Sequence, residues 1–326
     1  MAIGSMSDFQ IYPEQYYGGM YESIAQNINA FNGASNNALV LVNENIKGHY
    51  EYESFVQFKD IVARRDITSV SDATDLKLAQ EELVNVKLNR ILGPVAQTLD
   101  AWKKIDEDPE VMSFILGQMA AEQKTKNYLN SILYAVESAL DNVSDLEYDA
   151  TGASTTTLTH SHLVSGMSKM GDQGQRIVAW VMHSKPFWDL MGQAISDKIT
   201  NVADTVIYGG SPGTLGRPVI VTDSAALTDA NGSATDTYNV LGLVAGAGTV
   251  KESEPDNVAF QMITGKDNLV YRYQGEYAFN VGVRGFQWDV SNGGSNPTDA
   301  TLSTATNWDK VANDVKDCAG VRIVVE

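Results

Sequence analysis

The stretch I-V-A-W-V-M-H-S-K-P-F-W-D-L, residues 177–190, predicts a buried strand that runs directly into a helix. Its first residues are all apolar, which is typical of a strand covered on both faces. Ser184, followed by Lys185 and Pro186, indicates a helix start, because serine caps the first turn and proline suits its opening positions. A second strand is predicted at 216–223, G-R-P-V-I-V-T-D. Strand, helix and strand in this order indicate an α/β unit.

The same stretch raises the question of catalysis, because it places His183 beside Ser184, with Asp189 and Asp223 downstream. Neighbouring residues of a strand point to opposite faces, so these two side chains are expected to diverge. Ser184 also lacks the G-x-S-x-G elbow of a nucleophile. Capping therefore explains Ser184 better than catalysis does, and a soluble hydrolase is the less favoured alternative.

Other motifs point away from enzymatic chemistry. His160, His162 and His183 lack the i, i+4 spacing of a helical zinc site, so a cap or surface role is favoured. The glycine-rich turns have neither the order of a dinucleotide fingerprint nor a following G-K-[ST]. The acidic residues at 251–256 are interpreted as a solvated turn. Cys318 is the only cysteine, which excludes an intrachain disulfide. We therefore expect no catalytic residue, no cofactor and no metal.

Composition indicates a soluble folded protein of 326 residues with two or three compact units. No apolar run is long enough to span a membrane, and the N-terminus does not resemble a signal peptide. The net charge of −18 argues against specific nucleic-acid binding, which needs clustered Lys and Arg. Residues 47–90 differ, with seven basic and eight acidic side chains. Such mixed charge suits pairing with a neighbouring molecule.

The first hundred residues predict an arm followed by a hairpin. Residues 1–45 contain repeated Gly and Asn and show little periodicity. They are therefore either flexible or ordered by lying across another element or molecule. Helical spacing of apolar residues predicts a helix over 49–65. Alternation of Val84, Val86 and Leu88 with polar residues predicts a strand in a long hairpin. Because a lone hairpin is marginal in water, this one should rest on another chain or on its own body.

The strongest helix signal begins at D-E-D-P-E, residues 106–110, where Asp108 can cap and Pro109 suits the first turn. Apolar residues then recur to about residue 142, which predicts a helix roughly 50 Å long. An ordinary core helix and the backbone of an extended, flat subunit both fit this pattern. A short helix is predicted at 161–170, polar loops at 224–237 and 291–306, and strands at 240–248, 269–290 and 321–326.

The order of these elements resembles the major capsid protein of tailed bacteriophages, the Hong Kong 97 type of fold. The phrases that carry the resemblance are R-R-D-I-T-S-V at 64–70 with V-K-L-N-R-I-L-G-P-V-A-Q-T at 86–98, the stretch at 177–190, and T-L-G-R-P-V-I-V-T-D-S at 214–224. The resemblance spans about residues 46–290. It implies an α+β fold with an N-terminal arm, an extended β-hairpin loop, a long spine helix in a peripheral domain, and an α/β axial domain.

The resemblance also divides the chain. It implies an N-terminal arm at 1–45, an extended loop over a neighbouring subunit at 46–92, a peripheral domain at 93–150 and 255–290, an axial domain at 151–254, and a C-terminal loop and returning strand at 291–326. Charged side chains of the loop are then the candidates for contacts between subunits: Arg64, Arg65, Asp66, Lys77, Glu81, Glu82, Lys87 and Arg90.

The implied function is structural. The chain would be a major capsid protein that self-assembles as hexamers and pentamers into the icosahedral shell enclosing a tailed phage's double-stranded DNA. Its implied partners are copies of itself, a separate scaffolding protein, a portal, a decoration protein, and DNA enclosed without specific binding; no membrane is involved. The implied location is the virion capsid, assembled in the host cytoplasm. The alternative is an encapsulin-like compartment shell. A cargo-loading partner encoded nearby, in place of a terminase and portal, would favour this alternative.

Overall fold

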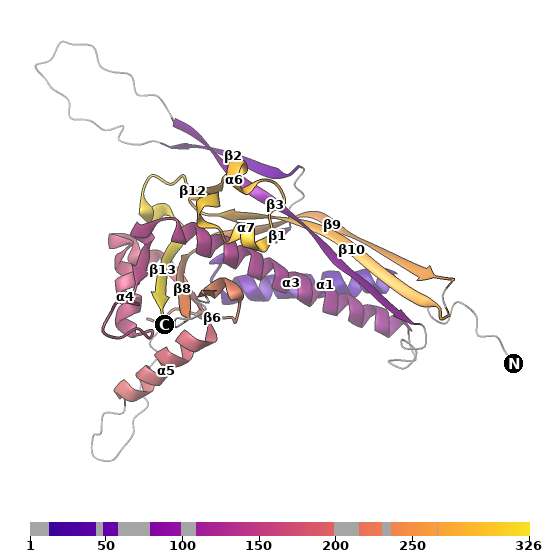
Figure 1. Ribbon diagram of the computed structural model, residues 1–326, viewed down its shortest axis with the longest axis horizontal. Helices are drawn as coiled ribbons and strands as arrows, with labels where there is room; N and C mark the ends of the chain where they lie inside the picture. Colours follow the sequence, from indigo (N-terminus) through magenta and orange to yellow (C-terminus); the bar gives the residue numbers. More distant parts are fainter. Residues whose placement is uncertain are drawn as a thin grey trace, which may run out of the picture.

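The structure is a computed structural model that describes residues 13–43, 48–57, 79–98, 109–198, 215–229, 236–265 and 267–326. These residues form a mixed α+β subunit in which a long helix, α3 (Pro109–Asp141), runs between two sheets (Figure 1). The predicted α+β class is confirmed.

The six-stranded sheet contains the strand predicted at the start of 177–190. β5, Ile177–Met182, leads into α5, Ser184–Lys198, and pairs in parallel with β6, Val219–Val221. β5 also pairs antiparallel with β8, Thr237–Val244. The strand order is β4-β13-β8-β5-β6, with β7 joined to β8. The remaining strands are β4 (Glu147–Asp149), β7 (Thr228–Asp229) and β13 (Gly320–Val325).

β13 is buried along its whole length because helices cover both of its faces. On one face Arg322 points to Glu137 of α3. On the other face Ile323 packs so closely on α4, His160–Ser168, that a Cβ at Gly166 would lie 2.5 Å from it. Alternate residues of a strand point to opposite faces, so α3 and α4 enclose the sheet between them.

The five-stranded sheet, in the order β1-β9-β10-β3-β2, carries the hairpin. β3 is long enough to pair with β2 over residues 79–86 and with β10 over residues 86–98, so it joins the hairpin to the body. The strands of this five-stranded sheet are β1 (Leu39–Asn43), β2 (Tyr50–Gln57), β3 (Ala79–Thr98), β9 (Gly248–Ile263) and β10 (Val270–Val283). A separate two-stranded sheet joins β11 (Phe286–Trp288) to β12 (Trp308–Lys310).

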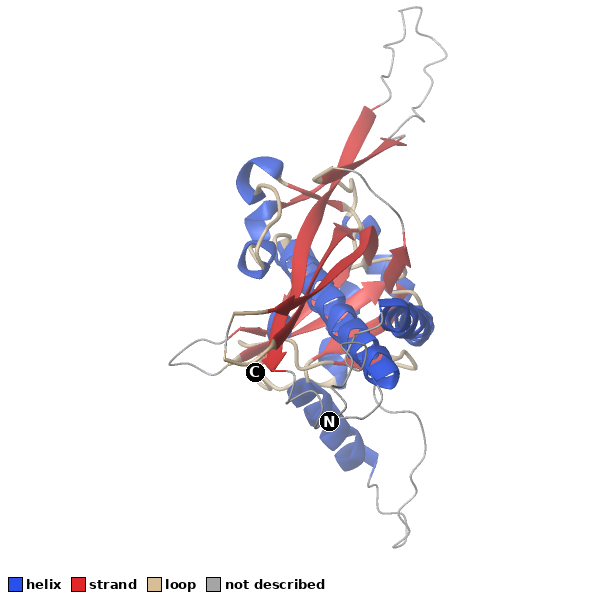
Figure 2. Ribbon diagram, turned by 90° about the vertical axis from the view of Figure 1, so that its right-hand side faces the viewer, coloured by secondary structure: helices blue, strands red, loops and turns tan. Residues whose placement is uncertain are grey.

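α3 spans Pro109–Asp141, as the helix signal predicted. Unexpectedly, α1, Pro13–Ala34, lies alongside it (Figures 1 and 2). The two backbones touch: a Cβ at Gly117 would lie 2.2 Å from the carbonyl oxygen of Tyr16. Of the two alternatives stated for residues 1–45, the second, order gained by lying across another element or molecule, agrees with the packing of residues 13–34 on α3. The helix itself was not predicted, because the repeated Gly and Asn obscure an apolar face formed by Tyr16, Met20 and Ile24.

Three further predictions are corrected. The predicted helix at 49–65 is strand β2 over its described part, residues 50–57, because Y-E-Y-E alternates as a strand paired with β3 requires; residues 58–65 lie outside the described residues. The predicted solvated turn at 251–256 lies within β9, where Glu252 and Asp256 face the buried Lys124 of α3 and Glu254 pairs with Lys87 of β3. The predicted polar loop at 291–306 includes short helices α6 (Val290–Gly293, beginning just before it) and α7 (Asp299–Leu302).

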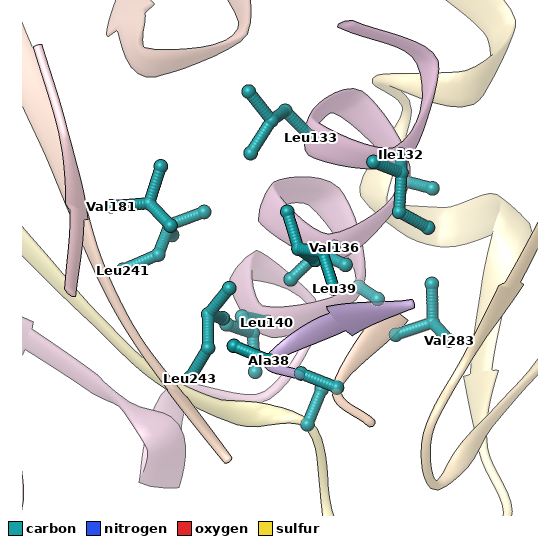
Figure 3. Packing of buried hydrophobic residues seen from close by; sticks show 14 of the residues in the cluster. Ala38, Leu39, Ile132, Leu133, Val136, Leu140, Val181, Leu241, Leu243 and Val283 are labelled. Carbon is teal, nitrogen blue, oxygen red and sulfur yellow. The ribbon is translucent and has the colours of Figure 1, made fainter. Parts of the chain in front are cut away.

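One hydrophobic core joins the two sheets through α3. Figure 3 shows Ile132, Leu133, Val136 and Leu140 of α3 between Val181, Leu241 and Leu243 of the six-stranded sheet and Ala38, Leu39 and Val283 near the five-stranded sheet. All of these side chains are buried. Since burying one aliphatic side chain contributes about 1.5–3 kcal/mol, this packing fixes the position of α3 between the sheets.

Candidate assembly surfaces and their anchors

The predicted contact residues fall into three groups. Arg64, Arg65, Asp66 and Lys77 lie outside the described residues. Glu81 and Glu82 lie on β3, opposite Phe55 and Ser54 of β2. Lys87 and Arg90 lie further along β3, where the hairpin meets the body.

Lys87 and Arg90 both form ion pairs within the chain. Lys87 is buried and pairs with Glu254 of β9, and Arg90 pairs with Asp299 of α7. These pairs link β3 to β9 and to α7. Their part in contacts between subunits remains a prediction.

A third pair at the base of the hairpin was not predicted. Lys251 of β9 donates to Glu51 at 2.7 Å and to Glu53 at 2.8 Å, and both acids belong to β2. Partial burial alone would lower the pKa of Lys251, but the hydrogen bonds to the two carboxylates raise it overall. The hairpin therefore leaves the body from a fixed base.

Lys124 anchors the middle of α3 to β9. Its ammonium group is buried, donates to Asp256 at 2.7 Å and pairs with Glu252. The rings of Tyr128 and Tyr277 lie 5.6 and 5.2 Å from the nitrogen, within the range of a cation–π contact. Burial raises the pKa of Asp256 despite the neighbouring lysine.

Arg322 anchors the end of α3 to the six-stranded sheet. Its Nε lies 3.0 Å from Glu137, and its Nη2 lies 3.4 Å from Asp229 of β7. Nη1 bonds both Asp141, the last residue of α3, and Glu147 of β4. Burial raises the pKa of Glu137 to about 7, although Arg322 opposes the shift, and the three other carboxylates add to it.

The histidine and serine at the start of α5 form a cap. His183 Nδ1 accepts from the Lys185 N–H at 3.3 Å, and Asp223 accepts from the Ser184 N–H at 3.2 Å. The predicted N-cap residue, Ser184, is thus the first helical residue, and His183 and Asp223 supply the cap. The His183 and Ser184 side chains approach to 3.5 Å rather than diverge. Hydrogen bonds from the side chain and backbone of Ser184 lower the pKa of Asp223.

His162 also caps a helix. Thr159 Oγ1 accepts from the His162 N–H at 3.3 Å, and His162 Nδ1 accepts from the Thr159 N–H at 3.4 Å. This reciprocal box at the start of α4 confirms the predicted cap role of His162. Across the described ranges, no group of three or more His, Cys, Asp or Glu side chains could hold a metal ion. None of the described helices is long and apolar enough to cross a membrane.

The sequence matches a family model over residues 8–322, nearly its whole length, and the family is described as Gp13-like, major capsid protein 13-like. The chain belongs to this major capsid protein family. No curated protein matches its sequence significantly.

Solved phage structures share the fold at low identity. The capsid of Ralstonia phage GP4 is 11% identical, covers 89% of this chain and 87% of its own, and has a TM-score of 0.51. Microbacterium phage Oxtober96 gives 8% identity, 89% and 90% coverage, and a TM-score of 0.52. Both likenesses concern the fold alone. The predicted Hong Kong 97-like fold is confirmed.

Family membership decides the class of function. The protein is a structural capsid protein rather than an enzyme, and it self-associates into the capsid shell of a virion. The encapsulin-like alternative is less well supported. The capsid role agrees with the cap geometry, in which His183 and Asp223 accept hydrogen bonds from the first backbone N–H groups of α5.

Proposed function

We propose that this capsid protein assembles as hexamers and pentamers into the icosahedral shell that encloses a tailed phage's double-stranded DNA. The family match over residues 8–322 carries the proposal. Closed shells need one set of contacts that repeats under symmetry, and an extended subunit with surfaces far apart suits such contacts. Figure 1 shows the hairpin strands and α5 leaving the body in different directions.

The proposal assigns a role to each part of the chain. Residues 46–92 form the loop over a neighbouring subunit, 93–150 with 255–290 the peripheral domain, 151–254 the axial domain, and 291–326 the C-terminal loop and returning strand. The arm at 1–45 contacts adjacent subunits as well as α3 of its own chain, on which residues 13–34 pack.

Contacts between subunits are proposed to combine charge with exposed apolar side chains. The eight charged residues predicted from Arg64 to Arg90 supply the first kind. Three large side chains supply the second: Tyr52 on β2, Ile91 on β3 and Trp188 on α5 are exposed by 60%, 63% and 67%. Tryptophan and tyrosine are enriched among residues that dominate binding energy, which supports a role for Tyr52 and Trp188.

The remaining partners follow from the capsid role. A separate scaffolding protein, a portal and a decoration protein are proposed to act with this chain, which assembles in the host cytoplasm. The net charge of −18 would repel packaged DNA and so favours enclosure without specific binding.

Negative-stain microscopy with sedimentation of the purified chain tests the proposal, with the chain expressed alone and with neighbouring phage genes. Closed shells, or regular hexamers and pentamers, are the expected result. A discrete monomer or dimer under every condition would overturn it. A cargo enzyme copurifying inside the shells, in place of DNA packaging, would favour the compartment alternative.

A further inference from the structure

The Arg322 cluster joins α3 to the six-stranded sheet with one cation and four carboxylates. Glu137 and Asp141 come from α3, Glu147 from β4 and Asp229 from β7. Asn239 of β8 donates to Glu137 at 3.1 Å and to Asp229 at 3.2 Å. Four elements of the sheet and the end of the helix therefore meet at a single site.

The cluster has more negative charge than its cation can neutralise. With all four carboxylates ionised, three negative charges remain in excess around Arg322. Glu137 is the most buried of the four acids, with 10% of its side chain exposed, against 27% for Glu147. An ionised Glu137 is therefore both poorly solvated and close to like charges, whereas a proton on it relieves both penalties.

We propose that the Arg322 cluster is a proton-operated junction between α3 and the six-stranded sheet, tight when the Glu137 carboxyl carries a proton and looser when that carboxyl ionises. The charged groups that face Glu137 are Arg322, Asp141, Glu147 and Asp229. The device belongs to the single subunit, so it does not depend on the geometry of the shell.

The direction of the effect follows from the raised pKa of Glu137. A carboxyl that binds its proton more tightly in the closed state stabilises that state at low pH, and this stabilisation is lost as pH rises through about 7. If opening returns Glu137 from about 7 to its ordinary 4.5, the opening equilibrium rises about tenfold between pH 6 and pH 8.

Hydrogen exchange of the full-length chain, read by mass spectrometry, measures this opening. Labelling times are matched for intrinsic exchange at pH 6 and pH 8, and the assembly state is held constant by sedimentation. In the wild type, peptides covering 137–149 and 225–229 should lose about tenfold in protection at pH 8. Peptides of β10 serve as the internal reference. An equal change in β10, or none in the junction, would overturn the proposal.

Variants distinguish the effect of the proton on Glu137 from a general loosening of the subunit. Glu137→Gln cannot ionise, so its junction peptides should exchange equally at the two pH values. Glu122→Gln removes an exposed acid from the same helix and should keep the wild-type response. A wild-type pH response in Glu137→Gln would refute the assignment. If that variant does not fold, Glu147→Gln provides the test. Because it removes one charge that repels an ionised Glu137, the loss of protection in the junction peptides should occur at lower pH. An unchanged transition would count against Glu137.

Discussion

Lys124 Nζ donates to both carboxylate oxygens of Asp256, at 2.8 and 2.7 Å, in a site that is almost closed to solvent on both sides. This contact fixes the middle of α3 to β9 of the five-stranded sheet. Arg322 fixes the end of the same helix to the other sheet. The long helix is thus held by one buried cation at each sheet, in addition to its apolar packing.

Replacing Lys124 with methionine should lower the free energy of unfolding by about 3 kcal/mol, because Asp256 and Glu252 would remain as buried, uncompensated carboxylates. Methionine preserves most of the packing of the lysine stem. Urea denaturation of subunits in one assembly state measures the loss. Lys126→Met, on the exposed side of the same helix, should stay within about 0.5 kcal/mol of the wild type. Similar losses in both variants would show that the pair contributes little.

Two adjacent glycines of α1 offer a matched test of its contact with α3. A Cβ at Gly19 would lie 2.6 Å from the carbonyl oxygen of Phe114, whereas a Cβ at Gly18 would meet nothing within 4 Å. Gly19→Ala should therefore destabilise the subunit by about 1–3 kcal/mol, because a helix backbone must move. Gly18→Ala should be neutral or stabilise by up to about 1 kcal/mol. Thermal unfolding of the two variants compares them, and a reversed order would show that α1 does not pack on α3.

Cys318 should resist thiol reagents until the chain unfolds. The side chain is fully buried, and burial raises its pKa to about 11, so at pH 8 it is a shielded thiol with little thiolate. Iodoacetamide should add no mass to the folded protein and one adduct in concentrated urea. Because the chain has a single cysteine, each adduct reports this position. Rapid labelling of the folded chain would show that the segment just before β13 opens readily.

The sequence predicts α3 and the β5–α5 unit well because their signals are local. Pro109 and the apolar stripe that follows define α3, and the apolar run at 177–182 with the adjacent Lys185-Pro186 defines the strand and the helix start. Each signal lies within a few residues of the element it predicts.

β2 and the buried anchors could not be predicted in this way. The apolar residues of 49–65 fit a helical spacing as well as a strand, and pairing with β3 decides between them. Lys124 finds Asp256 at a separation of 132 residues, and Lys251 finds Glu51 at 200. No local pattern marks such partners. The acids at 251–256 look solvated in sequence because the lysines that pair with them, Lys87 and Lys124, lie on other elements.

Limited trypsin digestion should distinguish free subunits from assembled particles at the proposed loop, with Lys77 as the informative site. If residues 67–90 lie over a neighbouring subunit, cleavage after Lys77 should be fast in free subunits and slow in shells purified by sedimentation. Lys87 provides the control within the chain: it is buried and paired with Glu254, so cleavage there should be slow in both states. Mass spectrometry of the fragments identifies each cut. Equal cleavage after Lys77 in both states would mean that assembly leaves the loop uncovered, contrary to its proposed contact between subunits.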